Sequence, residues 1–295
     1  MHSSLLLAAV AVLFTALAPR VHGAELLLRD GQTVAFLGDS ITQQGAESSG
    51  GYVRLVERGL AVNGVVIKVI PAGIGGNKSN QMRERLDGQV LRLKPDWMTL
   101  SCGVNDVWHG VNGVSLADYK INITDIVERC EKAGTRVLIL TATQINLPVD
   151  NPPNTKLAEY NAFLRELATQ RKLPLADLNA DMAAEQKALA AAGITRPLTV
   201  DGVHMNAYGN QMMARGVLRS FGLDDKQMQK AVEAWRALPD AVPLTAKLKI
   251  SLPELEVLER LAAVRKQSID QFLADQLGAA LKSTLAETPP AASVR

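Results

Sequence analysis

The chain of 295 residues is poor in cysteine and histidine and carries little net charge, and these shortages exclude several classes of protein. Two cysteines cannot make a disulfide scaffold, and no C-x-x-C or H-E-x-x-H motif supplies a set of metal ligands. A candidate phosphate-binding loop, GIGGNKS, has Ala72 and Asn77 at both positions where that motif requires glycine. A formal net charge of +2 is too small for a protein built mainly to neutralise nucleic-acid phosphates.

The first 23 residues have the pattern of a secretory signal peptide. The apolar run Leu5–Ala18 is shorter than the roughly 20 residues that span a bilayer, and small residues precede a cleavage point between Gly23 and Ala24. We therefore expect the protein to be secreted or periplasmic, with no stable membrane insertion after processing. The alternative is an uncleaved membrane anchor.

Short apolar runs alternate with amphipathic stretches through most of the chain, which is typical of an α/β protein. Repeating β-α units indicate a parallel sheet with helices on both faces, and five strands fit a flavodoxin-like doubly wound fold. The predicted strands are Thr33–Leu37, Val65–Ile70, Trp97–Ser101, Arg136–Thr141 and Leu173–Asp177; the predicted helices are Tyr52–Val62, Asn80–Leu93, Leu116–Ala133, Thr155–Arg171, Asp181–Ala192 and Ala207–Phe221.

The α/β pattern stops near residue 239, which divides the chain into a signal peptide at 1–23, a large α/β domain at 24–238 and a small appendage at 239–295. The appendage has the pattern of one short strand, two helices that meet near Gln267–Ser268 and a frayed tail. Pro253 stands where a proline opens a helix.

The two cysteines fall at different ends of one βα unit. Cys102 ends the third predicted strand, and Cys130 stands near the end of the helix that follows it. Because that helix runs antiparallel to the strand, the two sulfurs should lie too far apart to bond. We expect free, buried thiols despite the oxidising compartment.

Polar and glycine residues follow the predicted strands at positions that a parallel sheet brings to one edge. The carboxyl ends of parallel strands meet there, and ligands of doubly wound folds bind there. The residues concerned are Ser40 after the first strand, Gly75 to Asn77 after the second, Gly103 to Asp106 after the third, and Asp201 to Asn206 before the last predicted helix.

Among these residues, a serine, a histidine and an aspartate have the chemistry of nucleophilic catalysis. Two of the four histidines fall in the predicted signal peptide, which leaves His109 and His204 as candidate bases. Asp201 stands three residues before His204, where a turn lets its carboxylate orient the ring while the other ring nitrogen faces Ser40. Asp106 stands at the same spacing before His109, but it falls in the turn after the third strand, and we expect it to serve that turn. The pattern therefore favours acyl transfer by Ser40, His204 and Asp201.

Acyl transfer also needs hydrogen-bond donors aimed at the oxyanion that forms. Glycine at position 76 allows a backbone N–H to approach closely, and the side-chain amide of Asn105 offers a second donor. The backbone N–H of Ser40, at a helix start, is a natural third donor.

The segments GDSIT, AGIGGN, GVND and DGVH resemble the four blocks of the SGNH/GDSL hydrolase family, in the usual order and spacing, across roughly Thr33–Phe221. The resemblance implies a flavodoxin-like sheet and ester hydrolysis without metal or cofactor, including carbohydrate deacetylation and lysophospholipid or thioester cleavage. In the second block, register with the family pattern favours Gly76 over the adjacent Gly75. The resemblance implies these roles: Ser40 as nucleophile, Ser40, Gly76 and Asn105 as oxyanion-hole residues, His204 as base and Asp201 as its partner.

Each of these residues also has a purely structural interpretation. Ser40 could be only the N-cap of the following helix. His204 could be a buried histidine whose hydrogen bonds are satisfied, and Asn105 and Asp106 could simply build a turn after the third strand.

Asp39, Trp108 and His109 stand beside the nucleophile and oxyanion segments and are candidates for substrate binding. Trp108 offers a face that can stack on a sugar, although it and His109 could equally pack a surface loop. The loops expected at this edge are polar or small and offer no obvious groove for a long acyl chain. We expect an acetyl ester on a polar carrier such as carbohydrate; the alternatives are a lysophospholipase or thioesterase, or a non-catalytic carbohydrate-binding or assembly protein on a degenerate hydrolase scaffold.

The appendage weakly resembles a ribbon-helix-helix module, a fold that pairs two chains through their strands. In that family outward-facing strand residues can read DNA, and here Lys247 and Lys249 would be that pair. Two lysines are a weak electrostatic footprint, and an exported hydrolase meets no operator DNA, so we expect no nucleic-acid partner. Two interpretations of the appendage stay open: a homodimer formed through it, and a helical cap packed on its own hydrolase domain, since strand-helix-helix patterns are common.

Overall fold

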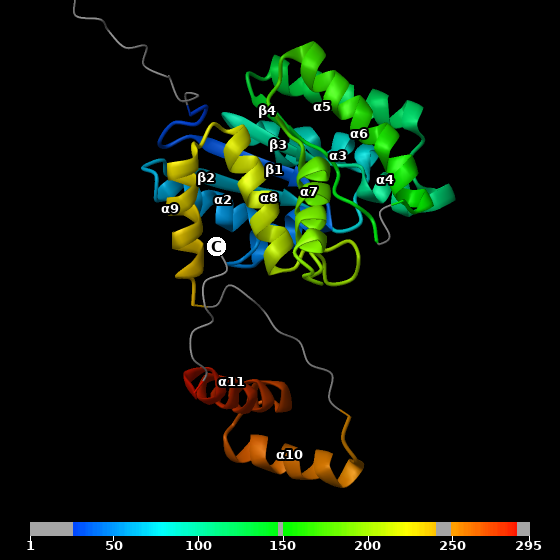
Figure 1. Cartoon of the computed structure of the whole chain (residues 1–295). Coiled ribbons are helices and arrows are strands. Elements are labelled where there is room, and N and C mark those ends of the chain that lie inside the picture. Colours follow the sequence, from blue (N-terminus) through cyan, green and yellow to red (C-terminus); the bar gives the residue numbers. More distant parts are fainter. Residues whose placement is uncertain (1–25, 147–149, 240–248, 288–295) are drawn as a thin grey trace, which may run out of the picture. The chain divides into compact units, whose positions relative to one another are not determined.

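The computed structural model describes residues 26–146, 150–239 and 249–287 (Figure 1). The predicted signal peptide and Lys247 lie outside these residues. The chain divides into two compact units, residues 1–243 and 244–295, and each is described here by itself. Within the described ranges, no helix is both long and apolar enough to cross a membrane.

The large unit contains a sheet of five parallel strands in the order β2-β1-β3-β4-β5. This order, with a helix after each strand, is that of a flavodoxin-like doubly wound fold, so the predicted fold class is confirmed. The strands are β1 (Thr33–Gly38), β2 (Lys68–Gly73), β3 (Trp97–Ser101), β4 (Arg136–Leu140) and β5 (Leu175–Ala176).

The central strands are buried on both faces because they are nearly continuous apolar runs. Residues 34–38 of β1 and all of β3 are buried. Because both faces of these strands are covered, the loops at the strand ends are the places where polar side chains can meet a ligand.

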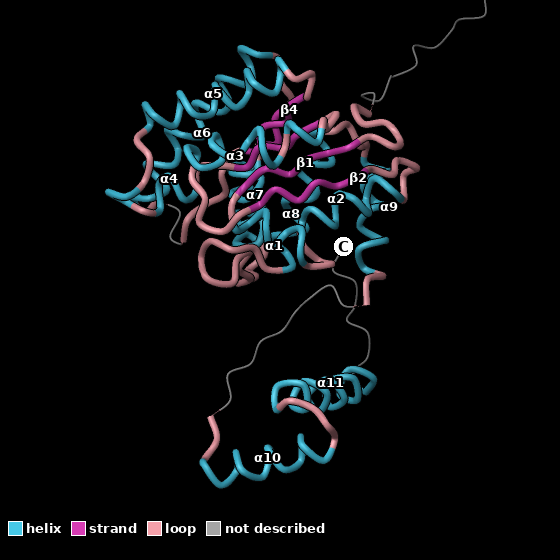
Figure 2. The backbone as a smooth tube through the Cα atoms, turned by 180° about the vertical axis from the view of Figure 1, so that it is seen from behind, coloured by secondary structure: helices cyan, strands magenta, loops and turns pink. Residues whose placement is uncertain are grey.

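Helices cover both faces of the sheet, as Figures 1 and 2 show from opposite sides. One face carries α1 (Ser40–Glu47), α2 (Tyr52–Ala61), α7 (Leu178–Ala191), α8 (Ala207–Ser220) and α9 (Asp225–Arg236). The other face carries α3 (Ser79–Gln89), α4 (Val104–Trp108), α5 (Leu116–Lys132) and α6 (Pro152–Arg171). Two 3-10 turns, Leu91–Leu93 and Gly110–Asn112, complete the unit.

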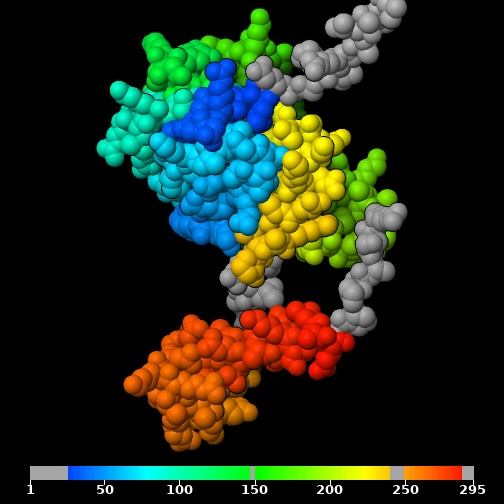
Figure 3. All heavy atoms as spheres, turned by 90° about the vertical axis from the view of Figure 1, so that its left-hand side faces the viewer, coloured from blue at the N-terminus to red at the C-terminus, as the bar shows by residue number. Residues whose placement is uncertain are grey.

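Helices α8 and α9 pack closely against α2, and Figure 3 shows these segments side by side. At Gly59 of α2, an added Cβ would lie 2.6 Å from the end of the Leu218 side chain of α8, so a larger residue there would force Leu218 to shift. The indole N–H of Trp235, on α9, donates to the carbonyl of Leu55 at 2.9 Å. These contacts hold α8 and α9 against α2.

Two strands differ from their predicted bounds by more than one residue. Val66, in the segment predicted to open the second strand, instead bonds to the loop before β1: its N–H donates to Asp30 Oδ1 at 2.8 Å, and its carbonyl accepts from Gly31 N–H at 2.8 Å. β2 therefore begins only at Lys68 and continues to Gly73. β5 is shortened to two residues, because it pairs with β4 alone, at the edge of the sheet.

Helices α1, α4 and α9 are absent from the predicted set. α4 has only five residues, which is too short for an apolar period to show. α1 is a short helix of mostly polar and small residues, with the sequence SITQQGAE, so it has little apolar periodicity. α9 starts with a capping box, in which Asp224 and Gln227 bond to each other's backbone N–H groups at 2.8 and 3.0 Å. That Asp-x-x-Gln signal is visible in the sequence.

Both cysteines are free and buried, as expected. Cys102 follows β3, and Cys130 lies near the end of α5. Burial raises the pKa of both thiols, so neither is a reactive thiolate at neutral pH.

The small unit contains two helices, α10 (Leu252–Val264) and α11 (Ile269–Glu287). Ser251 caps α10 in a capping box with Glu254. The predicted strand before α10 is wrong for its described part, residues 249–251, which have no strand structure. A strand requires a second strand to satisfy its backbone groups, and the described part of this unit supplies none.

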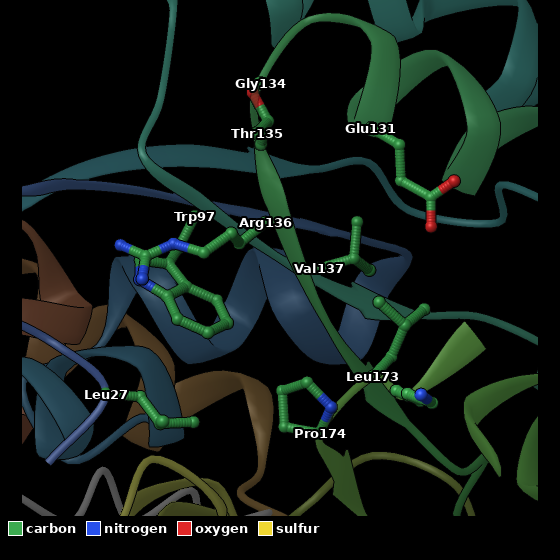
Figure 4. A pocket seen from close by; sticks show the side chains of 10 residues that line it. Leu27, Trp97, Glu131, Gly134, Thr135, Arg136, Val137, Leu173 and Pro174 are labelled. Atoms are coloured by element: carbon green, nitrogen blue, oxygen red, sulfur yellow. The ribbon is translucent and has the colours of Figure 1, made fainter. Parts of the chain in front are cut away.

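A cavity of about 480 Å³ opens beside the amino ends of β3 and β4 (Figure 4). Trp97 and Arg136, the first residues of these strands, lie at this cavity, with the guanidinium 4.3 Å from the ring of Trp97. Leu27, Leu173 and Pro174 also line it. The cavity therefore lies at the opposite edge of the sheet from the carboxyl ends, where Ser40 and the other candidate residues follow the strands.

Candidate active site

Ser40 is the first residue of α1, and only Asp39 separates it from the end of β1. Asp39, and not Ser40, is the N-cap, because its Oδ1 accepts from the Ile41 N–H at 2.9 Å. The interpretation of Ser40 as the helix cap is therefore wrong, and its hydroxyl is available for other bonds. The turn is tight: a Cβ at Gly38 would lie 2.0 Å from the hydroxyl oxygen of Thr42, so only glycine fits.

The His204 ring bonds to both other members of the predicted catalytic group. Its Nε2 lies 2.8 Å from Ser40 Oγ, and its Nδ1 lies 2.6 Å from Asp201 Oδ2. The structure thus brings together residues 164 positions apart in the sequence. In this arrangement the ring can accept the hydroxyl proton while the carboxylate holds the Nδ1 tautomer.

Asp201 also shapes the loop that carries His204. Its Oδ1 accepts from the backbone N–H groups of Val203 and His204, at 3.0 and 2.8 Å. Gly202 adopts φ +95°, and its carbonyl accepts from the Asn146 N–H at 2.7 Å. A Cβ at this position would overlap the Asn146 side chain, so the turn requires glycine for both reasons. The Asp-x-x-His spacing is therefore set by a local turn.

The electrostatic state of Asp201 suits the role of orienting partner. Its partial burial would raise the pKa of the carboxyl, but hydrogen bonds from the His204 ring and from two backbone N–H groups hold this pKa below its ordinary value of 3.8. The carboxylate is therefore charged at neutral pH. It can stabilise the imidazolium that forms when His204 takes a proton.

Three candidate oxyanion donors lie around Ser40. The Gly75 N–H donates to Gln43 Oε1 at 2.8 Å, whereas the Gly76 N–H has no acceptor within the described part of the chain. A Cβ added at Gly75 would lie 3.8 Å from Ser40 Cβ, so this loop runs beside the nucleophile. Of the two glycines, the geometry therefore favours Gly76, at φ +73°, as the donor.

Asn105 lies on the short helix α4, and not in a simple turn after β3. Its Nδ2 donates one hydrogen to the carbonyl of Asn77 at 3.2 Å, which leaves the second hydrogen for another acceptor. The Ser40 N–H, in the first turn of α1, has no intrahelical acceptor. Together with the Gly76 N–H, these groups are the three candidate donors for an oxyanion at Ser40.

Asp106 is buried behind the oxyanion segment. Its Oδ1 accepts from both the backbone N–H and the hydroxyl of Ser79, at 3.0 and 2.5 Å, and its Oδ2 accepts from the Cys102 thiol at 3.5 Å. Burial raises the pKa of this carboxyl although the bonds from Ser79 and Cys102 oppose the shift. Asp106 therefore holds α4 against the start of α3 and is not exposed to a substrate.

The three candidates for substrate binding have different surroundings. The Asp39 side chain is only 2% exposed and is used as a helix cap, so the proposal that it touches the substrate needs correction. Trp108 is 45% exposed and His109 is also exposed, at the end of α4. Neither forms a hydrogen bond to Ser40 or His204, and their role in binding stays a prediction.

Gln43 and Arg85 contact the site loops and were not predicted. Gln43, on α1, holds Gly75 as described above. Arg85, on α3, donates to the carbonyls of Gly38 and Ala72, each at 2.8 Å. No short motif marks either residue, because both act through contacts that only the folded chain creates.

The buried charge of Asp39 leads to a prediction about stability. Desolvation by burial is the main cause that raises the pKa of Asp39 from 3.8 to about 6. The native state thus holds this proton at pH values where the unfolded chain has lost it. The ionised carboxyl destabilises the fold above about pH 6, and the penalty disappears as the pH falls below 4. Such a shift corresponds to roughly 3 kcal/mol at most.

Asp39→Asn keeps an acceptor for the Ile41 N–H but removes the charge. We expect this variant to be more stable to urea than the wild type at pH 8, with the gain disappearing near pH 3.5. Asp224→Asn is the matched control, because it changes an exposed N-cap of α9 and should show no such pH-dependent gain. Equal stability of Asp39→Asn and the wild type at pH 8 would refute the prediction.

The chain is similar in sequence to known esterases. The profile of the GDSL-like Lipase/Acylhydrolase family matches residues 36–212. An acetylxylan esterase of Geobacillus stearothermophilus is 26% identical over 213 residues, which cover 66% of this chain and 95% of that protein. Esterase TesA of Pseudomonas aeruginosa is 27% identical over 177 residues, which cover 59% and 79% of the two proteins.

Solved structures show the same similarity. Axe2, an acetylxylan esterase from G. stearothermophilus, has a TM-score of 0.60 and 25% identity, with coverage of 67% of this chain and 97% of that chain. The acetyl xylan esterase AlAXEase has a TM-score of 0.59 and 32% identity, with coverage of 64% and 98%. Alanine variants of Axe2 described as catalytic mutants replace a serine, an aspartate and a histidine, and that aspartate stands three residues before that histidine.

Proposed function

The chain belongs to the GDSL-like lipase/acylhydrolase family and is a carboxylic ester hydrolase, and from this premise we propose that it removes acetyl groups from a polar carrier such as carbohydrate. Ser40 is the nucleophile, His204 the general base and acid, and Asp201 the residue that orients His204. One observation carries the mechanism: the His204 ring bonds to Ser40 Oγ through one nitrogen and to Asp201 through the other.

In the acylation half of the reaction, Ser40 Oγ attacks the carbonyl carbon of the ester as its proton passes to His204 Nε2. The carbonyl π electrons move onto the oxygen, and the N–H groups of Gly76 and Ser40 and the Asn105 amide stabilise the negative charge. His204 then gives its proton to the leaving alcohol oxygen as the C–O bond breaks. The product is an acyl-enzyme on Ser40 and a free alcohol.

In the deacylation half, water takes the place of the alcohol. His204 accepts a proton from the water while the water oxygen attacks the acyl carbon. The tetrahedral intermediate uses the same donors, and its collapse returns the proton from His204 to Ser40 Oγ. The acid product leaves and the hydrogen-bonded arrangement of the three side chains is restored.

The choice of an acetyl ester rests on the surroundings of the site and on its relatives. The Asp201 side chain is 50% exposed, and the segments beside Ser40 and His204, TQQGAESSGG and TRPLTVDGVH among them, are polar or small, whereas a long acyl chain requires an apolar groove. Two of the relatives described above are acetylxylan esterases. Both points support a short acyl group on a sugar.

A screen of p-nitrophenyl esters from acetyl to palmitoyl, together with acetylated xylo-oligosaccharides and a lysophospholipid, tests this proposal. We expect kcat/KM to be highest for the acetyl substrates and to fall as the chain lengthens. A preference for octanoyl or longer esters, or for the lysophospholipid, would contradict it and favour the alternative of a lysophospholipase or thioesterase.

We propose that the protein works outside the cytoplasm, as a secreted or periplasmic enzyme. The pattern of residues 1–23 supports export, and polymeric substrates must be met outside the cytoplasm. N-terminal sequencing of the exported protein should begin at Ala24. A protein that retains Met1 and stays in the membrane fraction would support the uncleaved anchor instead.

We propose that the small unit joins two copies of the chain. Among its described residues only Ala262 and Phe272 are buried, which is too little for a small unit to be stable by itself. The exposed apolar side chains recur at helical spacing and are Val257, Leu261 and Val264 on α10 and Leu277, Leu281 and Leu285 on α11.

Deleting residues 244–295 tests the role of the small unit. We expect light scattering to show a dimer for the full chain and a monomer for the truncated chain, with kcat on p-nitrophenyl acetate unchanged. A full chain that is monomeric at micromolar concentration would end the dimer proposal and leave the helical cap as the explanation.

A further inference from the structure

Three groups that can donate to an oxyanion come from loops after three different strands. Ser40 follows β1, Gly76 follows β2, and Asn105 lies on α4 after β3. The pairing of β1 with β2 ends at Gly38 and Gly73, before these groups begin. Contacts other than the sheet must therefore set the distance between the nucleophile and its donors.

The guanidinium of Arg85, on α3, connects these loops. Its Nη2 donates to the carbonyl of Gly38 and its Nη1 to the carbonyl of Ala72, both at 2.8 Å. Its Nε donates to Asn77 Oδ1, also at 2.8 Å. The carbonyl of Asn77 in turn accepts from Asn105 Nδ2 at 3.2 Å. One side chain thus links the turn before Ser40, the loop of Gly76 and the amide of Asn105.

The acceptors of Arg85 are all neutral oxygens. Besides the two carbonyls and Asn77, Nη1 donates to Gln89 Oε1 at 2.8 Å, and within the described residues no carboxylate forms an ion pair with Arg85. Arg83, on the same helix, instead pairs with Asp125 at 2.8 Å. The contribution of Arg85 is therefore geometric, because a planar guanidinium fixes several oxygens in one plane.

We propose that Arg85 is a positioning residue, which holds the Gly76 N–H and the Asn105 amide at the correct distance from Ser40. This proposal rests on the function proposed above. The side chain acts through Gly38, Ala72 and Asn77 and does not itself touch the substrate.

Loss of Arg85 should affect the transition state more than the bound substrate. The oxyanion forms only as Ser40 attacks, so misplaced donors weaken the binding of the transition state more than the binding of the substrate. Loss of Arg85 should therefore lower kcat and leave KM nearly unchanged. An ångström-scale misplacement costs on the order of 100-fold, and we expect kcat to fall roughly 10- to 100-fold.

Arg85→Met and Arg83→Met, assayed with p-nitrophenyl acetate, test the proposal. Arg83→Met removes the same charge from the same helix but breaks the pair with Asp125 and a long bond to Asn122 Oδ1 at 3.5 Å, and no bond to the Gly38, Ala72 or Asn77 loops. It should keep kcat within about twofold of the wild type. Arg85→Lys, with a single ammonium in place of the planar fork, should recover only part of the loss. A folded Arg85→Met with wild-type kcat would overturn the proposal.

Asn77→Ala keeps the proposal testable if Arg85→Met does not fold. It removes the bond from Arg85 Nε and leaves the two carbonyl contacts in place. We expect a kcat roughly 10-fold lower, and a double variant with Arg85→Met only slightly worse than Arg85→Met alone, since both changes release the same loop. Full activity of Asn77→Ala would overturn the proposal.

Labelling of the wild type by a fluorophosphonate separates this proposal from the proposed function. If the wild type is labelled at Ser40 and Ser40→Ala is inactive, but Arg85→Met behaves as the wild type, only the role of Arg85 is overturned. If the wild type is not labelled and Ser40→Ala keeps its activity, the mechanism itself fails, whatever the Arg85 variants do.

Discussion

Replacing Ser40 by alanine is expected to lower kcat on p-nitrophenyl acetate roughly 10⁵- to 10⁶-fold, the loss that follows removal of a catalytic serine. The hydroxyl has no structural duty that alanine would leave unmet. Asp39 caps α1, and Ser40 Oγ bonds to the His204 ring. The far-UV circular dichroism and the urea midpoint of the variant should therefore match those of the wild type.

Ser48→Ala is the matched control for this experiment. Ser48 lies at the other end of α1, at its C-cap position, away from His204. It should retain activity within about twofold of the wild type. A purified Ser40→Ala protein that retains even a few per cent of wild-type kcat would contradict the assignment of the nucleophile.

Replacing His204 by alanine is expected to cause a loss of similar size, since the serine has no other base within hydrogen-bond reach in the described structure. Asp201→Asn should cost less, roughly 10²- to 10⁴-fold, because Asp201 orients the ring and takes no proton. The double variant Ser40→Ala/His204→Ala should be no slower than either single variant, because the two residues act as a unit.

His109→Ala is the matched control for the base. It removes the other histidine of residues 24–295, an exposed side chain with no contact to Ser40. We expect its kcat to stay within a few-fold of the wild type, with any change confined to KM if His109 touches the substrate. Steady-state kinetics of both variants would contradict the account if His109→Ala lost activity and His204→Ala kept it.

Much of the fold is predictable because its strands bury both faces. β1, β3 and β4 are apolar runs between loops rich in glycine and polar residues, and their positions agree with the prediction to within a residue. The bounds of β2 are harder to predict because Val66, in the apolar stretch before it, bonds to the loop at Asp30 and Gly31. Such pairing across more than 30 residues leaves no local pattern.

The candidate site shows the same limit. The local segments around Ser40 and His204 were visible in the sequence because Gly-Asp-Ser and Asp-x-x-His are short turns set by their own residues. The choice between Gly75 and Gly76 depends on which N–H is already used, and Gln43, 32 residues away, uses that of Gly75. Contacts of this kind come from the tertiary fold.

The choice between Asp39 and Ser40 as the cap of α1 was also beyond local reasoning. Aspartate and serine are both good N-caps, and both precede the same helix. The backbone makes Asp39 the cap, with φ −100° and ψ −151°. One residue of register therefore decides that Asp39 is buried and that the Ser40 hydroxyl is free to bond to His204.

The central claim, that His204 and Asp201 activate Ser40 as a nucleophile, is tested most directly by covalent labelling. The protein is incubated with a fluorophosphonate and then analysed by intact mass and peptide mapping. The account predicts a single adduct on Ser40, formed quickly in the wild type, much more slowly in His204→Ala and absent in Ser40→Ala. An unlabelled wild type, or an adduct on another residue, would contradict the claim.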